Sequence, residues 1–164
     1  RVTKLLRLIH SCAYGIHDIS RTELDKTHGL PRFNMPFELG LFLGFRHQHG
    51  TATKNCLILD REPFRYQKFL SDIAGQDIQS HQNHPAEAIR CVRDWLRTTS
   101  DDRNIPGSEE IARRYNLFER ELPILCRKLK LTVTHLIYAD RCMLISEWLK
   151  HRPHPIWHKK FGIR

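Results

Sequence analysis

The segment from Asn34 to Phe45 constrains the fold most, because it has the pattern of a helix that is apolar on nearly every side. Asn34 is of the type that caps the free amide groups of a first helical turn, and Pro36 is tolerated there because its missing N–H needs no partner. A helix of this kind is typical of one that packs against a sheet. Its apolar residues are Met35, Phe37, Leu39, Leu41, Phe42, Leu43 and Phe45.

One carboxylate, Glu38, lies in this apolar run about a turn after the helix start. An unpaired charge among apolar neighbours is costly, so we expect Glu38 to be partnered, protonated or used in function. The simpler interpretation is that Glu38 complements the helix dipole and faces water. The preceding segment favours a functional role. Residues 13–20 have the pattern of a short strand that ends in Asp18 and Ser20, and a polar loop leads from there to the helix.

A parallel sheet is the structure that these elements predict. Residues 56–59 form a second apolar strand, which Asp60 follows. Strands that are apolar on both faces are typical of parallel sheets covered by helices, and open α/β folds bind ligands at the carboxyl edge of such sheets. We therefore expect Asp18 and Glu38 to lie together at that edge.

Further elements follow from spacing and from turn residues. Helices are predicted over residues 1–11, from Pro63 to Gly75 and from Pro85 onward, with a brief third strand at residues 76–78. So small a sheet is rarely stable alone. Because the chain opens with Arg rather than Met, we expect upstream residues to supply further strands, with another subunit as the alternative.

Four regions are predicted along the chain: an α/β domain over residues 1–97, a linker over 98–107, a helical appendage over 108–150 and a basic tail over 151–164. In the appendage, Ser108 is expected to cap a first helix that Pro123 interrupts. Thr132 or Thr134 is expected to cap a last helix, which runs to Lys150.

The formal net charge is +9, from 27 Lys and Arg residues against 18 Asp and Glu residues. Part of this excess lies in the last fourteen residues, in Arg152, Lys159, Lys160 and Arg164. Attraction for the phosphates of nucleotides or nucleic acid is therefore expected, although a dedicated nucleic-acid groove does not follow.

The cysteines and histidines indicate which redox compartment suits the protein and whether a metal site is expected. The five cysteines are odd in number and widely spaced, which predicts reduced thiols in a cytoplasmic protein rather than a disulfide framework. Histidines cluster at residues 47–49, 81–84 and 151–158, but without the Cys or carboxylate partners that a zinc site usually has, so no metal site is predicted. No apolar run is long enough to cross a bilayer, and no membrane partner is expected.

Residues 15–20, Gly-Ile-His-Asp-Ile-Ser, and residues 34–40, Asn-Met-Pro-Phe-Glu-Leu-Gly, together carry a resemblance. The combination of a strand that ends in Asp and a helix that opens Asn-x-x-x-Glu-Leu-Gly resembles the nucleoside 2-deoxyribosyltransferase-like proteins and the related TIR-like predicted nucleotide-binding proteins. The similarity spans residues 1–96. It implies a flavodoxin-like (Rossmann-like) α/β fold that cleaves or transfers across an N-glycosidic bond, with a nucleoside, a nucleotide or NAD as substrate and no bound cofactor.

The resemblance also implies residue roles. Glu38 matches the family's catalytic carboxylate, Asp18 matches an acid that positions the substrate, and Asn34 matches a sugar-facing position. Breaking a C1′–N bond builds oxocarbenium character on the sugar, and a nearby carboxylate can stabilise that charge or attack the carbon. A second acid can orient a hydroxyl or handle protons. Ser20 is a further candidate for substrate binding.

Two arginines flank the loop between the predicted strand and helix. Arg21 and Arg32 are positioned to hold phosphate oxygens, and the alternative is that they are ordinary solvated loop residues.

Three functions from different classes stay open. The first is an N-glycosidic-bond hydrolase or transferase, which includes effectors in antiviral defence or toxin systems. The second is a non-catalytic nucleotide-binding sensor. The third is a module that docks nucleic acid or protein through the basic tail, and a homo-oligomer or a partner protein is compatible with each.

Overall fold

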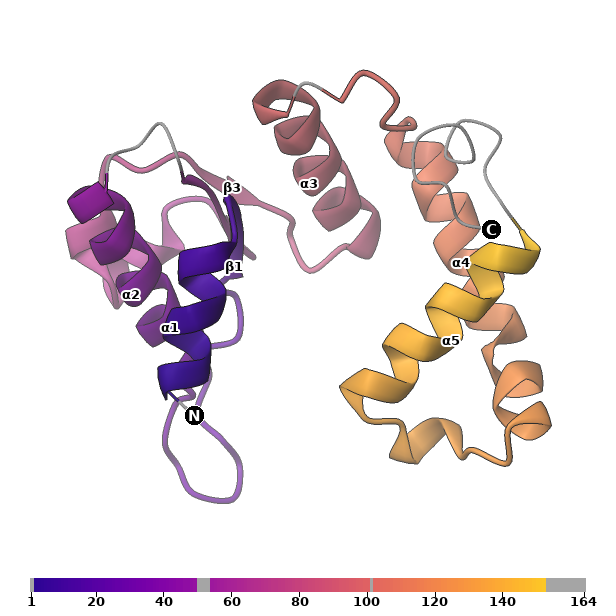
Figure 1. Ribbon diagram of the computed structural model, residues 1–164. Coiled ribbons are helices and arrows are strands. Elements are labelled where there is room, and N and C mark those ends of the chain that lie inside the picture. Colours follow the sequence, from indigo (N-terminus) through magenta and orange to yellow (C-terminus); the bar gives the residue numbers. More distant parts are fainter. Residues whose placement is uncertain (1, 50–53, 101, 153–164) are drawn as a thin grey trace. The chain divides into compact units, whose positions relative to one another are not determined.

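The computed structural model describes residues 2–49, 54–100 and 102–152, and its chain divides into two compact units, Arg1–Asp101 and Asp102–Arg164 (Figure 1). Each unit is described by itself. Residues 153–164, which include most of the predicted basic tail, lie outside the described part.

The first unit is built on a parallel sheet of three strands in the order β1-β2-β3. Its strands are β1 (Tyr14–Asp18), β2 (Asn55–Asp60) and β3 (Ile78–Ser80). The α/β class and the parallel sheet are as predicted from the apolar strands. Within the described residues, β1 and β3 are the edges of this sheet, and the expectation of further strands from elsewhere stays a prediction.

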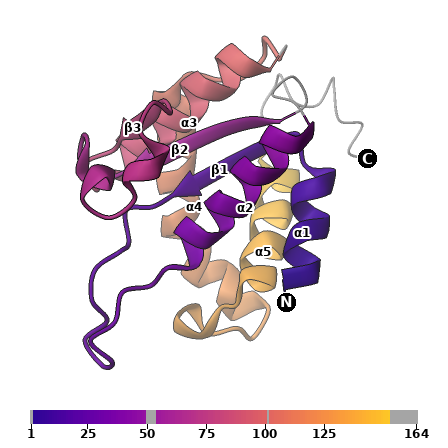
Figure 2. The same ribbon diagram turned by 90° about the vertical axis from the view of Figure 1, so that its left-hand side faces the viewer.

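One face of the sheet is covered by α2 (Asn34–His49), and α1 (Val2–Ser11) lies beside α2 in the same layer (Figure 2). Leu39 of α2 is fully buried, and burial of a side chain of that size contributes about 2 kcal/mol. The core on this face consists of Ile19, Leu39, Ile58, Tyr66 and Ile73. The nearly all-round apolar helix of the sequence is therefore the helix that packs on the sheet.

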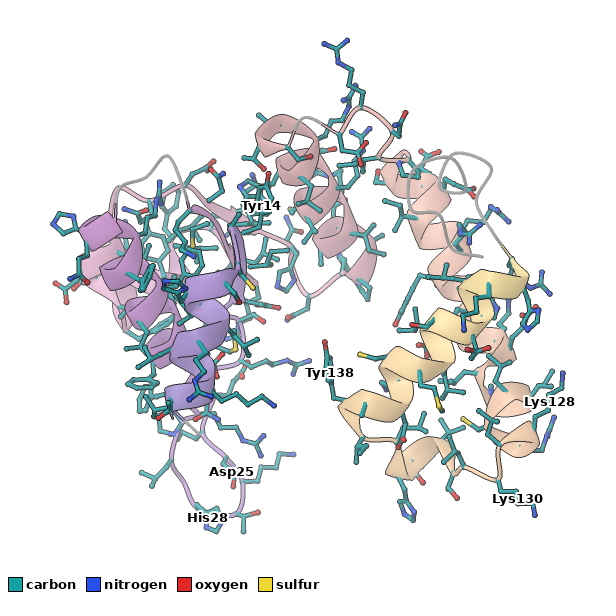
Figure 3. The ribbon with its side chains drawn as sticks, in the orientation of Figure 1. Tyr14, Asp25, His28, Lys128, Lys130 and Tyr138 are labelled. Carbon is teal, nitrogen blue, oxygen red and sulfur yellow. The ribbon has the colours of Figure 1, made fainter. Side chains whose placement is uncertain are left out.

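The opposite face is covered by α3 (Pro85–Thr99), which packs on β2 and β3. Leu57 and Leu59 point to this side, because side chains alternate along a strand, and they pack against Cys91 of α3. Tyr14, at the start of β1, is labelled in Figure 3. Its ring lies edge-on to that of Trp95, with ring centroids 5.8 Å apart.

The segment between β2 and β3 differs from the prediction. In place of one helix from Pro63 to Gly75 it forms two short 3-10 turns, η2 (Arg65–Lys68) and η3 (Ser71–Ile73). Phe64 has a left-handed backbone with φ of 58°, and Leu70 has a non-helical backbone with φ of −147° and ψ of 58°. These two residues interrupt the helical path that the apolar spacing predicts.

The second unit is a pair of helices, α4 (Ser108–Lys128) and α5 (Tyr138–His151), joined through the 3-10 turn η4 (Val133–His135). Its core consists of Phe118, Leu122, Cys126, Leu144 and Trp148. Glu121 accepts hydrogen bonds from Nε1 of Trp148 and from Nη2 of Arg152, each at 2.7 Å, so it ties the end of α5 to the middle of α4.

Three boundary predictions in this unit are wrong. Pro123 does not interrupt α4, because the buried Leu122 and Cys126 on either side pack on one face and offset a proline cost of about 3 kcal/mol. Ser108 is the first residue of α4, after Gly107, and provides no side-chain cap. The last helix begins at Tyr138, where the Asp140 carboxylate accepts the N–H of Ile137 at 3.1 Å, and neither Thr132 nor Thr134 caps it.

In the part of the chain that the structure describes, no helix combines the length and apolar character that a membrane span requires.

Candidate functional site

Polar residues gather where the three strands end. Asp18 ends β1, Asp60 ends β2, Ser80 ends β3, and His81 follows directly. The register pairs Asp18 with Leu59 and Asp60 with Ser80, so these strand ends meet at one edge of the sheet. This carboxyl edge is where open α/β sheets bind ligands.

Asp18 is held at this edge through one of its two carboxylate oxygens. Its Oδ1 accepts the N–H of Ser20 at 2.9 Å and lies 3.4 Å from Nε2 of His81. Its side chain is 46% exposed, and no hydrogen bond to Oδ2 is found among the described residues. The carboxylate is therefore fixed in place while Oδ2 stays available as an acceptor.

His81 is the buried partner of this pair, with a side chain only 7% exposed. Its Nδ1 accepts the N–H of Asn83 at 3.1 Å, so in the neutral ring the proton is on Nε2, which faces Asp18. Gln82 and Asn83 both have positive φ, and the N–H of His84 bonds the carbonyl of His81 at 2.8 Å. This tight turn between β3 and α3 sets the position of the imidazole.

Asp60 and Arg65 form a buried ion pair at the end of β2. Oδ1 of Asp60 accepts hydrogen bonds from Nε of Arg65 at 2.8 Å and from Nη2 at 2.6 Å. The same guanidinium donates to the carbonyls of Ile19 and Ser20 and to the hydroxyl of Thr22. Asp60 is fully buried, and its Oδ2 has no hydrogen-bond partner among the described residues. The pair thus links the end of β2 to the segment that follows β1.

Glu38 lies in the second turn of α2 and is half-buried. Among the described residues it has no hydrogen bond or ion pair. Its neighbour Leu39 packs in the same buried cluster as Ile19, the neighbour of Asp18. No contact joins the two predicted acids in the described structure, and the alternation along β1 that points His17 and Ile19 toward α2 does not point Asp18 toward that helix, so their meeting in one site stays a prediction.

The other predicted site residues lie around this edge in different settings. Asn34 is the exposed first residue of α2, and among the described residues its side chain makes no hydrogen bond, so the predicted cap is not formed. Ser20 is buried and holds Asp18 through its backbone. Arg21 is exposed and has no ion pair among the described residues.

Arg32 is engaged within the loop between β1 and α2, where it lies 3.5 Å from Asp25. Oδ1 of Asp25 also accepts the backbone N–H groups of Thr27 and His28, which order the far end of this loop (Figure 3). These backbone hydrogen bonds lower the pKa of Asp25. Arg32 thus supports the loop in the form that the structure shows.

His17 precedes Asp18 but points into the core on the α2 side. Its ring lies against that of Phe42, with centroids 5.1 Å apart, and neither ring nitrogen has a partner among the described residues. Burial lowers the pKa of His17 from 6.5 to about 4. His17 is therefore neutral at pH 7 and packs as a core residue.

Surface hollows lined by described residues lie elsewhere in the chain. One of about 180 Å³ lies between α4 and α5, and a more open one of about 650 Å³ is lined by Arg113, Asn116, Glu119 and Arg120 of α4. A third, of about 300 Å³, is lined by Leu43, Arg46, His47 and Gln76. None of these hollows is lined by two carboxylates. Within the described residues, no group of three or more His, Cys, Asp or Glu side chains is arranged to hold a metal ion.

Sequence reasoning missed two members of this site, His81 and Arg65. His81 was detectable as the residue after a third strand, which the prediction placed at residues 76–78 rather than Ile78–Ser80. Arg65 gave no such signal, because it lies in a turn where the spacing of apolar residues predicts a helix.

Comparisons with protein-family models, with curated proteins and with solved structures find no match to this chain.

Proposed function

We propose that the first unit binds a nucleoside, a nucleotide or NAD at the carboxyl edge of its sheet and cleaves the N-glycosidic bond, passing the sugar to water or to another base. The observation that carries this proposal is the state of Asp18. One oxygen is fixed by two donors, while the other is without a partner among the described residues, on a half-exposed side chain. Such an oxygen is suited to accept a sugar hydroxyl and so to orient the ring.

Glu38 is the carboxylate that we assign to the bond-breaking step. A sugar that loses its base gains positive charge at C1′, and an anionic group nearby stabilises that charge or forms a bond to the carbon. This half-buried carboxylate has no ion pair among the described residues, so no neighbouring cation there competes with the charge that develops on the sugar. The absence of a partner for Glu38 among the described residues supports this role over a structural one.

Arg21 extends the proposal to phosphorylated substrates. Its guanidinium is exposed next to Ser20 and is not used by any described residue, so it is available for phosphate oxygens. Nucleotides and NAD carry such groups, whereas nucleosides do not. A preference for phosphorylated substrates that is lost in Arg21→Gln would identify this contact.

The test is to incubate the full chain with NAD, nucleotides and deoxynucleosides and to follow the released base by chromatography. Glu38→Gln removes the charge at almost unchanged volume, and we expect it to abolish release. Glu109→Gln, in the first turn of α4, is the matched control and should leave release unchanged. Equal release by Glu38→Gln and by the unmodified chain would overturn the role of Glu38.

The sensor alternative is separated by the same samples. Tight binding of a nucleotide that Asp18→Asn weakens, with no base released under any condition, would show a binding module at the same edge instead of an enzyme. Binding to nucleic acid with a steep salt dependence, unaffected by Asp18→Asn, would favour a docking function instead.

A further inference from the structure

We infer that Arg65 is a positioning residue for the proposed site and that it acts on Asp18 through the peptide unit between Ile19 and Ser20. The effect that we expect on activity rests on the proposed function. The hydrogen bonds that carry the inference do not depend on any substrate.

The two ends of that peptide unit carry the two contacts. The carbonyl of Ile19 accepts a hydrogen bond from Nη2 of Arg65 at 2.9 Å, and the N–H of Ser20 donates to Oδ1 of Asp18 at 2.9 Å. Because a peptide unit is planar and nearly rigid, fixing its carbonyl also fixes the direction of its N–H. The guanidinium therefore determines where the Ser20 N–H points, and with it the orientation of Asp18.

Arg65 can do this because it is itself immobilised. Its side chain is 9% exposed, with two hydrogen bonds to Asp60 and one from Nη1 to the Thr22 hydroxyl at 2.9 Å. Its guanidinium also lies 4.8 Å from the centroid of the Phe69 ring. Hydrogen-bond acceptors thus lie on several sides of the planar guanidinium. A lysine ammonium, whose three donors share one nitrogen atom, cannot match this arrangement.

The buried pair is poorly explained by stability alone. A buried ion pair is often no more stabilising than apolar residues of similar volume, and here Oδ2 of Asp60 is also left without a partner in the described structure. What the pair provides instead is a fixed arrangement of the segment that follows β1. Three of its residues, Ile19, Ser20 and Thr22, share Arg65 as a donor, the first two through carbonyls and the third through its hydroxyl.

Hydrogen exchange of the Ser20 amide, measured by NMR on the full chain, tests the inference without any substrate. In Arg65→Lys we expect this amide to exchange at least about tenfold faster, while amides of β2 such as that of Leu59 keep their protection. Thr22→Val removes only the Nη1 contact and should leave Ser20 exchange unchanged. Unaltered exchange of the Ser20 amide in Arg65→Lys would overturn the inference.

A second variant keeps the test informative if Arg65→Lys does not fold. Asp60→Leu combined with Arg65→Met replaces both buried charges by apolar groups, which folded proteins tolerate better than one unpaired charge. Fast exchange at Ser20 in this folded double variant supports the inference, and native-like protection contradicts it.

The activity measurement separates this inference from the proposed function. If base release is found, Asp18→Asn combined with Arg65→Lys should be no slower than Asp18→Asn alone, because both changes act on one group. Additive losses would overturn the relay through Asp18. If no base is released from any substrate, the proposed function fails, and the exchange result alone decides the role of Arg65.

Discussion

Nε2 of His81 lies 3.4 Å from Oδ1 of Asp18, and the imidazole of this pair is buried while the carboxylate is half exposed. The contact joins the ends of β1 and β3, two strands that do not pair with each other in the sheet. The buried position of the imidazole makes His81 a support for Asp18 rather than the group that meets a ligand. Asp18 is the member of the pair that solvent can reach, and it is therefore the one that would meet a ligand in the proposed site.

This relationship predicts that the donor at position 81 matters more than the ring itself. His81→Gln places an amide N–H within similar reach of Asp18, whereas His81→Leu has no donor. We expect His81→Leu to weaken nucleotide binding about tenfold, the equivalent of about 1.4 kcal/mol for one charge-assisted hydrogen bond, and His81→Gln to weaken it less. Titration calorimetry with the nucleotide that binds best measures both.

Folding controls accompany this comparison. Both variants should keep the amide NMR spectrum of β2, because each fills the volume of the imidazole. Equal affinity in His81→Leu and in the unmodified chain would show that Asp18 does not need this donor.

The fold was largely predictable from the sequence because its main signals are local. Apolar composition alone predicts burial for two elements, the strand Asn55–Asp60 and the helix Asn34–His49. The positions of Asp18 at the end of a strand and of Glu38 near the start of a helix were predictable for the same reason. The expectation that the two acids act together in one site stays a prediction.

The features that the sequence did not predict depend on contacts between residues that are distant in sequence. Arg65 reaches Ile19 across 46 positions and His81 reaches Asp18 across 63, and neither pairing leaves a periodic trace. The prediction of a helix in place of the turns after β2 was wrong for a related reason. Phe64 and Leu70 take non-helical backbone conformations although the spacing of their apolar neighbours is helical.

His17 predicts a pH dependence of stability. Its pKa is about 4 in the folded chain and 6.5 for an exposed histidine. Between these values the unfolded state binds a proton that the folded state does not, so the free energy of unfolding falls as the pH is lowered. The loss is complete below about pH 4 and is of the order of 3 kcal/mol, whereas well above pH 6.5 His17 contributes no pH dependence.

Urea unfolding followed on the amide signals of β2 at several pH values between 4 and 7 measures this effect. His17→Leu, an apolar replacement of similar volume, should remove this part of the pH dependence. His28→Leu, at the exposed loop in Figure 3, should retain it. If the free energy of unfolding changed with pH equally in His17→Leu and in the unmodified chain, His17 would take up its proton in the folded chain without cost.

Lys54 predicts a loss of stability at the other end of the sheet. Its buried ammonium donates to the carbonyls of Ile9, His10 and Cys12 at 2.5, 2.9 and 2.6 Å, and so closes the carboxyl end of α1. Lys54→Met keeps the apolar stem but leaves these acceptors without their donor and removes a cation from a helix C-terminus. We expect a loss of about 2 kcal/mol in the free energy of unfolding.

The comparison for this variant is Lys68→Met, because Lys68 is exposed and should tolerate the change within about 0.5 kcal/mol. Urea denaturation of both variants at one pH, again followed on β2, gives the two values. Equal stabilities would contradict the capping role of Lys54.

The contact between Gly15 and Phe42 predicts a pair of changes that rescue each other. A Cβ added at Gly15 would lie 2.6 Å from Cε2 of the Phe42 ring, closer than carbon atoms approach without displacement. Phe42 is 2% exposed and packs between β1 and α2, so its ring has little space to move. Gly15→Ala should therefore destabilise the first unit by about 1–3 kcal/mol, the usual cost of overpacking a core.

Phe42→Leu shortens the side chain and should itself cost about 1–3 kcal/mol through the lost packing against His17. In the double variant the added methyl group fills part of the space that the ring leaves, so the combined loss should be smaller than the sum of the two single losses. A double-mutant cycle in urea measures this coupling, which we expect to be about 1 kcal/mol in favour of the pair. Strictly additive losses would mean that β1 and α2 do not approach through this contact.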